Sequence, residues 1–377
     1  MTRCLQVAGQ IEGELARGVH GRSNDRFLSV RQVAARYGIS LVTAQRVIQR
    51  LKHRGLLIGD STNRPLITGR ACRREAAANG SQPRRLGMVI TNIANPFFSR
   101  LCRHVQLAAA ARGYQLLMAG SQYEFAREKK AVDSFLEIGV EGLLIVPGLD
   151  EACARLYRQL IERGLRLVFV SRHVEHVAAD FVAADSFAAG AAVAGHLLSK
   201  DYDSFGYLGF GARLKRDARL HGFRSALLEE GITLDAKRIV CGEGGGVEHG
   251  YRAMGRLMRG RNRPRAVFAF HDLLAIGALR YCHEHGIAVP QEVAVAGFDN
   301  LPESRVTSPP LTTVSYPIES MARLALQCLL EDRGGGAEQR PSHRILLEPH
   351  LVIRRSTDPE ATAEEPSAPG EEIYEMP

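Results

Sequence analysis

The sequence predicts a two-lobed α/β domain, built from two doubly wound parallel sheets, that follows a small winged helix-turn-helix domain. Three observations support this prediction. Short, wholly apolar runs alternate with helix-like segments from Leu86 onward, which is typical of parallel sheets covered on both faces. Two helical patterns joined by a tight turn occupy residues 29–54. Positive charge is concentrated in the first quarter of the chain.

The first of the two helical patterns follows Ser29. The Ser29 side chain can cap a helix, and Gln32 three residues later completes a capping box that satisfies two free backbone N–H groups. Val33, Ala34 and Tyr37 then recur at helical spacing. We therefore expect a short helix that begins after Ser29 and ends before the turn at residues 38–40.

The second helical pattern begins where that turn ends, with Ser40 placed to cap it. Val47, Ile48 and Leu51 form an apolar stripe, and polar and cationic residues lie outside it. A helix with a buried stripe and a cationic face suits insertion into the major groove of DNA. Residues 56–68 then place two short apolar runs around a polar turn, which predicts a wing.

Charge supports the same interpretation independently. Residues 1–85 contain 16 Lys and Arg against 5 Asp and Glu, a net charge of +11, whereas the rest of the chain has a net charge of −3. A localised cationic module is explained by neutralisation of phosphates with release of counterions. The alternative is a solvated basic face that binds nothing. The helix-turn-helix pattern in the same residues argues against this alternative.

Composition narrows the class of protein. No apolar run approaches the roughly 18 residues that a membrane span needs, and residues 1–18 do not have the pattern of a signal peptide. The seven cysteines include no CxxC pair and no zinc-like spacing, so we expect reduced thiols and a cytoplasmic location. The glycine-rich stretch around residues 242–246 lacks the spacing of a phosphate-binding loop. We predict no catalytic residue, no metal ion and no cofactor.

Composition also sets the expected domain boundaries. Residues 69–85 are rich in Arg, Ala, Gly and Ser and predict a linker between a DNA-binding domain at 1–68 and the large domain at 86–357. Residues 358–377 carry seven carboxylates and no basic residue, which predicts a disordered acidic tail. The tail could fold back on the basic domain, although a solvated tail is the simpler interpretation.

The large domain has nine or more apolar strands over about 270 residues, too many for one sheet of usual size, so we expect two lobes. Ligands of open α/β sheets bind at the carboxyl ends of the strands, here in the cleft between two facing lobes. Aromatic side chains with Arg, Asp and Asn suit a sugar, because rings stack on its C–H faces and polar groups bind its hydroxyls. The candidates at strand ends are Asn95, Phe97, Phe98, Arg172, Arg219, His271 and Asp299.

The first domain resembles the GntR-type DNA-binding domain, on the pattern LSVRQVAARYGIS followed by T-x-x-RVIQRLKHRGLL. Leu41 and Gln45 stand where that family often has arginines, and the wing lacks the usual Gly-x-Gly-Thr-Phe ending, so the operator sequence does not carry over. The resemblance implies DNA contacts at Arg31, Ser40, Thr43, Gln45, Arg46, Thr62, Asn63 and Arg64.

Residues 86 to about 355 resemble the periplasmic-binding-protein-like sensor domain of the LacI/GalR family, through NPFF, HDxxAIGAL, VPQEVAVAGFDN and PPLTTV in order. The resemblance implies that the chain crosses between lobes near residues 183–185, 313–315 and 338–343. Ser171, His271 and Tyr316 depart from the family's common polar set, so the identity of the ligand does not carry over. The implied effector contacts are Asn95, Phe97, Phe98, Ser171, Arg172, Arg219, His271, Asp299 and Tyr316.

Several candidates also have a purely structural interpretation. Phe97 and Phe98 could be core residues at the start of a helix, and Arg172 could pair with Asp185. His271 could be a hydrogen-bonded group behind the ligand, and Asp272 is expected to cap the following helix.

Together the two resemblances imply a transcriptional repressor similar to arabinose-type repressors of the GntR class. It would bind double-stranded operator DNA as a homodimer and respond to a small-molecule effector, expected to be a carbohydrate. A transport solute-binding protein is disfavoured by the basic domain and the missing signal peptide. An enzyme acting on a sugar is disfavoured because no catalytic motif is recognisable.

Overall fold

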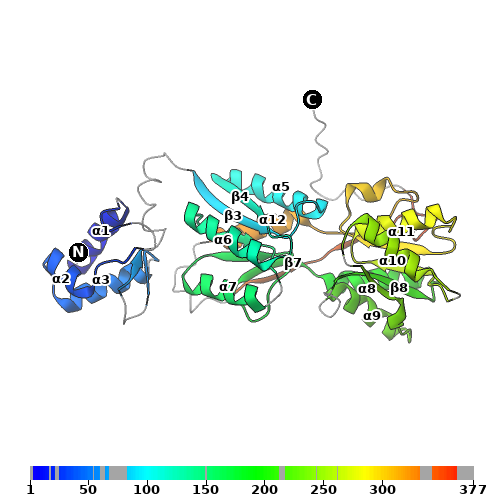
Figure 1. Ribbon diagram of the computed structural model, residues 1–377, viewed down its shortest axis with the longest axis horizontal. Coiled ribbons are helices and arrows are strands. Elements are labelled where there is room, and N and C mark those ends of the chain that lie inside the picture. Colours follow the sequence, from blue (N-terminus) through cyan, green and yellow to red (C-terminus); the bar gives the residue numbers. More distant parts are fainter. Residues whose placement is uncertain are drawn as a thin grey trace, which may run out of the picture. The chain divides into compact units, whose positions relative to one another are not determined.

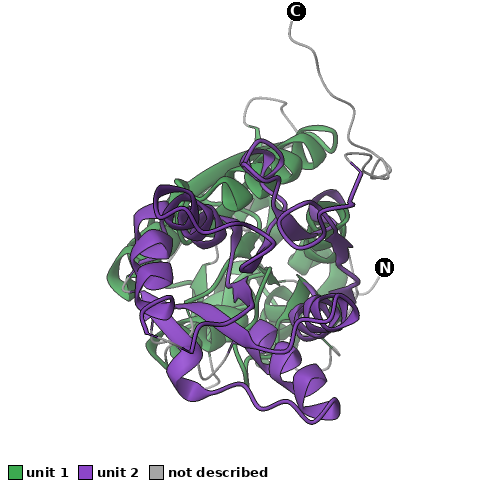
Figure 2. Ribbon diagram, turned by 90° about the vertical axis from the view of Figure 1, so that its right-hand side faces the viewer, with its two compact units in different colours: residues 1–183, 320–345 green, residues 184–319, 346–377 purple. Residues whose placement is uncertain are grey.

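The computed structural model describes residues 3–16, 18–21, 25–53, 55–59, 64–67, 83–148, 151–211, 217–242, 244–260, 262–331 and 342–362. The predicted DNA contacts Thr62 and Asn63 lie outside these residues, as do most of the expected linker and tail. The chain forms two compact units, residues 1–183 with 320–345 and residues 184–319 with 346–377 (Figure 2). Within the described ranges, no helix is both long and apolar enough to span a membrane.

Within its described residues, the N-terminal part of the first unit contains three helices and a pair of short antiparallel strands (Figure 1). The capping box is confirmed, since the Ser29 hydroxyl accepts a hydrogen bond from the Gln32 backbone and the Gln32 side chain accepts one from Ser29 N at 2.9 Å. Ser40 accepts from Thr43 N at 3.2 Å, as expected of a cap. The elements are α1 (Arg3–Ala16), α2 (Val30–Tyr37), α3 (Leu41–His53), β1 (Leu57–Ile58) and β2 (Leu66–Ile67).

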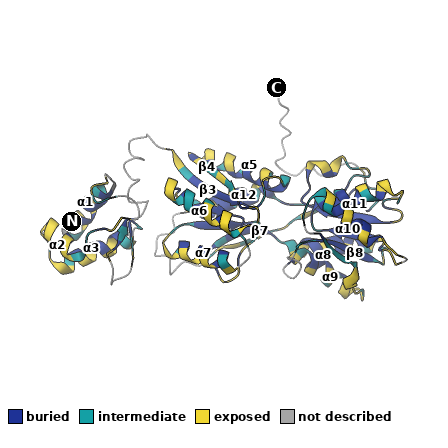
Figure 3. Cartoon of the chain, viewed as in Figure 1, coloured by how far each residue is buried: buried dark blue, intermediate teal, exposed yellow. Residues whose placement is uncertain are grey.

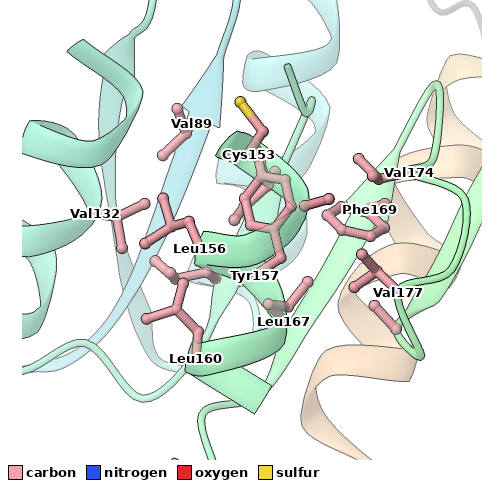
Figure 4. Packing of buried hydrophobic residues seen from close by; sticks show 14 of the residues in the cluster. Val89, Val132, Cys153, Leu156, Tyr157, Leu160, Leu167, Phe169, Val174 and Val177 are labelled. Carbon is pink, nitrogen blue, oxygen red and sulfur yellow. The ribbon is translucent and has the colours of Figure 1, made fainter. Parts of the chain in front are cut away.

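The rest of the first unit is a six-stranded sheet in the order β13-β7-β6-β5-β3-β4, whose strands β3 to β7 pair in parallel. Its core packs helix side chains onto the sheet, and the rings of Tyr157 and Phe169 meet edge to face at 5.0 Å (Figure 4). The elements are β3 (Arg84–Ile90), α5 (Pro96–Ala110), β4 (Tyr114–Gly120), α6 (Phe125–Ile138), β5 (Leu143–Ile145), α7 (Glu151–Glu162), β6 (Leu167–Val170), β7 (Asp180–Ala184), α12 (Ile318–Leu330) and β13 (Arg344–Leu347).

The second unit is another six-stranded sheet, in the order β14-β12-β11-β10-β8-β9, parallel except for the antiparallel edge strand β14. The prediction of two parallel α/β lobes is confirmed. The elements are α8 (Ser186–Ser199), β8 (Phe205–Phe210), α9 (Ala218–Glu229), η3 (Ala236–Arg238), β9 (Ile239–Gly242), α10 (Val247–Leu257), β10 (Ala266–Ala269), α11 (Asp272–Glu284), β11 (Ala294–Phe298), η4 (Pro302–Arg305), β12 (Thr312–Ser315) and β14 (His350–Val352).

The chain passes between the units at residues 183/184, 319/320 and 345/346. The first crossing lies where it was predicted, and the other two lie later in the chain than predicted. Strand β12 belongs wholly to the second sheet, because it pairs with β11. Strand β13 joins the first sheet, where the backbone N–H of Phe181 on β7 donates to the carbonyl of His343 at 2.9 Å. Pairing the otherwise open edge of β7 satisfies its backbone groups.

Helices α8 and α9 of the second unit approach each other at two glycines. A Cβ at Gly222 would lie 1.9 Å from the carbonyl oxygen of Phe187, and one at Gly190 would lie 2.0 Å from that of Arg219. No side chain larger than hydrogen fits at such a crossing. The contact matters for the candidate site because it sets the position of the first turn of α9, which carries Arg219.

Candidate functional site

One face of helix α3 is exposed and polar. Six of its residues, which recur at helical spacing, line a hollow on the surface: Val42, Gln45, Arg46, Gln49, Arg50 and His53. Exposed residues run along α2 and α3 (Figure 3), and Arg31 of α2 is among them. Arg64, beside β2, is exposed too. The predicted DNA contacts did not include Gln49, Arg50 and His53, although their helical spacing places these residues on the same face of the helix.

Ser40 and Thr43 differ from the other predicted DNA contacts. Their hydroxyls hydrogen-bond to each other at 2.9 Å, and the Ser40 hydroxyl also accepts from Thr43 N. Both residues therefore build the start of α3, next to the exposed apolar side chains of Leu41 and Val42.

The second unit gathers four of the predicted effector contacts, and Arg219 lies at their centre. Its guanidinium carbon lies over two rings, 4.2 Å from the centroid of Phe270 and 4.0 Å from that of Phe298. Nη1 donates to the carbonyl of Phe270, and Nη2 donates to the hydroxyl of Tyr316 at 2.8 Å. The guanidinium has five N–H donors, so it retains donors for a ligand after making these bonds.

Electrostatics keep Arg219 charged in this position. Burial by itself lowers the pKa of Arg219, but Tyr316, Asp299 and Asp217 raise it further than burial lowers it, so the net shift is upward. Asp217 is also the N-cap of α9 and accepts from Arg219 N at 3.2 Å. Burial raises the pKa of Asp217, even though the charge of Arg219 and the hydrogen bond from Tyr207 act to lower it. The two stacked rings leave the edge of the guanidinium as the part that can meet a ligand.

Asp299 follows strand β11 with an unusual backbone. It is buried, its φ of 114° lies in the left-handed region, and its N–H donates to the carbonyl of Val314 at 2.9 Å. Positive φ is costly for a residue with a Cβ, so the surrounding structure must hold it in place. Asp299 raises the pKa of Arg219 and that of Tyr316, as a negative charge in the same part of the second unit does.

His271 is the N-cap of α11, and the expectation that Asp272 would cap this helix was wrong. The Nδ1 atom of His271 accepts from Leu274 N at 3.3 Å. Asp272 instead turns into the protein, where it accepts from the Thr313 hydroxyl at 2.6 Å and from Leu301 N at 2.8 Å. Burial raises the pKa of Asp272 to about 7. His271 caps the helix because the Asp272 side chain binds Thr313 and Leu301, which are distant in sequence, rather than a backbone N–H group at the start of α11.

His271 is neutral at physiological pH. Burial, together with the positive charge of Arg219, lowers its pKa to about 3. With Nδ1 accepting the capping bond, Nε2 carries the proton and points to the glycine-rich loop, where a Cβ at Gly245 would lie 2.8 Å from it. His271 therefore offers a neutral N–H donor rather than a charge.

This pKa shift predicts how stability depends on pH. The folded pKa of His271 is below the unfolded value of about 6.5, so stability present above pH 6.5 should be lost as pH falls towards 3. The His271→Asn variant keeps an N-cap. We expect its free energy of unfolding to rise relative to that of the wild type by about 1.4 kcal/mol for each pH unit below pH 6.5. Urea unfolding between pH 7.5 and 4.5 measures the difference, with exposed His283→Asn on the same helix as control. Parallel curves for wild type and His271→Asn would contradict the assignment.

Tyr316 completes the group in the second unit. Its hydroxyl accepts from Arg219 and contacts Ser186, and its ring meets Phe298 edge to face at 5.0 Å. Burial raises the pKa of Tyr316, so the hydroxyl stays protonated. The structure thus brings together Arg219, His271, Asp299 and Tyr316. Sequence reasoning missed Phe270 and Phe298, although both are aromatic residues at the ends of apolar strands.

The predicted contacts in the first unit lie at the start of α5, in the segment that follows β3, and directly after β6. Asn95 caps α5, accepting from Phe97 N at 2.9 Å. Phe97 and Phe98 are both buried and meet edge to face at 5.1 Å, which supports a structural role for them. Their burial fits the core interpretation given above.

Ser171 and Arg172 directly follow β6. Ser171 has a φ of 70°, and its N–H donates to the carbonyl of Val182 at 2.9 Å. The Arg172 guanidinium lies 5.9 Å from the ring centroid of Tyr123. Asp185, the alternative partner considered for Arg172, caps α8 by accepting from Ala188 N. Among the described residues, no group of three metal-binding side chains comes together.

Comparison with known proteins gives the class. Residues 194–357 match the family of periplasmic binding protein-like domains. The HTH-type transcriptional regulator GalS of Salmonella typhimurium is 30% identical over 337 residues, which is 88% of this chain and 96% of GalS. A LacI-family regulator from Sanguibacter keddieii is 30% identical, with a TM-score of 0.64 over 73% of this chain and 99% of its own. The transcription regulator GntR from Chromobacterium violaceum is also 30% identical, with a TM-score of 0.65 over the same shares.

The fold, the site and these relatives define a transcriptional regulator with an effector-binding domain rather than an enzyme. The chain belongs to the LacI/GalR family of transcriptional regulators.

Proposed function

We propose that this regulator is a repressor whose affinity for its operator is controlled by a carbohydrate effector. In this proposal residues 1–68 form a GntR-type winged helix-turn-helix domain, 69–85 a linker, 86–357 the effector-binding and dimerisation domain, and 358–377 an acidic tail. The protein acts as a homodimer, which places two DNA-binding domains on a palindromic operator. The observation that carries the effector half is the guanidinium of Arg219, held between two aromatic rings beside Asp299.

The DNA-binding half rests on helix α3. Gln45, Arg46, Gln49 and Arg50 share one exposed face, and these side-chain types hydrogen-bond base edges and phosphates in the major groove. The exposed Leu41 and Val42 at the start of the helix suit the methyl groups of thymine. Ser40, Thr43, Arg31, Asn63 and Arg64 remain predicted contacts, and the strand pair β1–β2 supports the wing.

The Arg46→Ala variant should weaken operator binding. We expect a loss of about 1–3 kcal/mol if Arg46 reads a base, or a salt dependence lowered by about one unit if it contacts a phosphate. Fluorescence anisotropy on operator DNA at several salt concentrations distinguishes the two, and Arg31→Ala should behave in the same way. The control is Arg224→Ala, which removes an exposed cation from α9 in the second unit. Equal losses for Arg46→Ala and Arg224→Ala would mean that α3 does not lie in the groove.

The proposal of a carbohydrate effector is supported by the charged and neutral polar groups that surround Arg219. One positive group, the carboxylate of Asp299, the neutral imidazole of His271 and the protonated hydroxyl of Tyr316 lie together. A ligand with many hydroxyl groups and no net charge matches such a mixture of donors and acceptors. Effector binding then shifts the population of conformations of the dimer and with it the spacing of the two DNA-binding domains.

A thermal-shift screen tests this proposal. Purified full-length protein is heated with D-ribose, D-galactose, L-arabinose, disaccharides, sugar acids, polyols and purines. A ligand at a hundredfold excess over its Kd stabilises the native state by about 2.7 kcal/mol. A sugar that raises the melting temperature and changes operator affinity supports the proposal and fixes the sign of the response. A purine as the sole hit, or a sugar that leaves DNA binding unchanged, would contradict it.

A further inference from the structure

The loop that carries Asp299 is held in its conformation by side chains that lie behind it. Asp299 and Asn300 are consecutive residues with positive φ, 114° and 45°, and both are buried. Two adjacent side-chain-bearing residues in this region are costly unless their neighbours leave them no alternative. An unrestrained chain would relax towards negative φ and turn the Asp299 carboxylate away from Arg219.

Asn300 is the first restraint on this loop. Its backbone N–H donates to the Thr313 hydroxyl at 3.2 Å, and its side-chain Nδ2 donates to the Ser315 hydroxyl at 3.3 Å. Its Oδ1 accepts from Nη2 of Arg354 at 2.7 Å. Asparagine is also one of the residues that tolerate positive φ best. The side chain therefore ties the loop to strand β12 and to the segment that follows β14.

Arg354 is the second restraint, and it comes from the returning C-terminal segment. Its side chain is buried, and Nη1 donates to the Ser304 hydroxyl at 2.9 Å and to the carbonyl of Leu311 at 2.7 Å. With the bond to Asn300, one rigid fork contacts the loop, the short helix η4 after it and the residue that precedes β12. A lysine could not make three divergent bonds from one plane.

Asp272 is the third restraint, from the start of α11. Its two carboxylate oxygens accept from Leu301 N and from the Thr313 hydroxyl, which itself accepts from Asn300 N. Burial raises the pKa of Asp272, and the positive charge of Arg354 opposes part of that rise, as expected of two groups that bind the same loop. A Cβ at Gly297 would lie 2.3 Å from Oδ1 of Asp272, which shows how closely this carboxylate packs under β11.

We infer that Arg354, acting through Asn300 and supported by Asp272, is a positioning residue of the effector site that holds Asp299 in its left-handed conformation. The inference rests on the proposed role of Asp299 in effector binding. It assigns to the segment after β14 a part in ligand recognition, although that segment follows Asp299 by more than fifty residues.

Amide hydrogen exchange of the full-length protein without any sugar tests the inference. In Arg354→Met we expect the amides of residues 299–301 to exchange at least about tenfold faster than in the wild type, while those of β10 keep their rates. Arg354→Lys should give the same pattern and serves if the methionine variant does not fold. In an Asn300→Gly background, Arg354→Met should accelerate exchange at Asp299 no further, because Arg354 acts through the Asn300 side chain.

Ser356→Ala is the matched control. Ser356 is fully buried in the same segment, where its hydroxyl donates to the carbonyl of Val295 at 2.6 Å and accepts from Thr312 N at 2.8 Å. We expect this variant to lose global stability but to keep residues 299–301 protected. Equal protection of these residues in wild type and Arg354→Met, or an equal loss in Ser356→Ala, would overturn the inference.

Adding D-ribose to the wild type addresses the proposed function separately. Slower exchange at residues 299–301 with ribose, reduced in Arg354→Met, supports both proposals. Unchanged exchange counts against ribose as the effector, whereas the result without sugar still decides whether Arg354 positions the loop.

Discussion

Gly222→Ala is expected to destabilise the second unit severely, by about 3 kcal/mol or more, or to prevent its folding. The added methyl group would lie 1.9 Å from the carbonyl oxygen of Phe187 and 3.1 Å from the backbone nitrogen of Ala191. Both obstacles are backbone atoms of α8, so no side-chain rotation relieves the clash. Helices α8 and α9 would have to move apart, which opens the core between them.

Gly195→Ala on α8 is the control for this experiment. A Cβ at Gly195 meets no atom within 4 Å, so the substitution should leave stability unchanged or raise it by up to about 1 kcal/mol through helix propensity. Urea unfolding followed by circular dichroism measures both variants. Equal stability of the two alanine variants would contradict the close approach of α8 and α9 at Gly222.

Arg219→Lys should reduce effector affinity by about a hundredfold or more, even though the positive charge is kept. Lysine cannot stack as a plane between Phe270 and Phe298, and its ammonium group cannot bond the Phe270 carbonyl, Tyr316 and a ligand in the same fork. Loss of a charged hydrogen bond to a ligand costs about 1.5–3 kcal/mol, and loss of the planar stacking between the two rings adds to that loss.

Calorimetric titration with the sugar found in the thermal-shift screen measures this effect. Arg224→Lys, an exposed substitution on the same helix, should bind the sugar as the wild type does. Urea unfolding of Arg219→Lys should accompany the titration, because the variant also loses contacts in the folded state. Affinity within threefold of the wild type would place the effector elsewhere.

Local sequence patterns determined the helix caps of the N-terminal part and the strand arrangement of the two sheets. The capping box of Ser29 and Gln32 and the cap at Ser40 depend on residues only three apart, so they could be predicted without knowing the fold. The parallel sheets followed from wholly apolar runs that alternate with helical segments. Arg219, His271, Asp299 and Tyr316 could be proposed as a group from a family resemblance, and the second unit does bring them together.

Tertiary structure alone decided the arrangement within that group. The rings of Phe270 and Phe298 enclose Arg219 only because β10, β11 and α9 meet there. His271 caps α11 because Asp272 has stronger partners in Thr313 and Leu301, both distant in sequence. Caps and periodicity arise from interactions within one turn of chain, whereas a clamp or a buried carboxylate depends on segments that become neighbours only when the chain has folded.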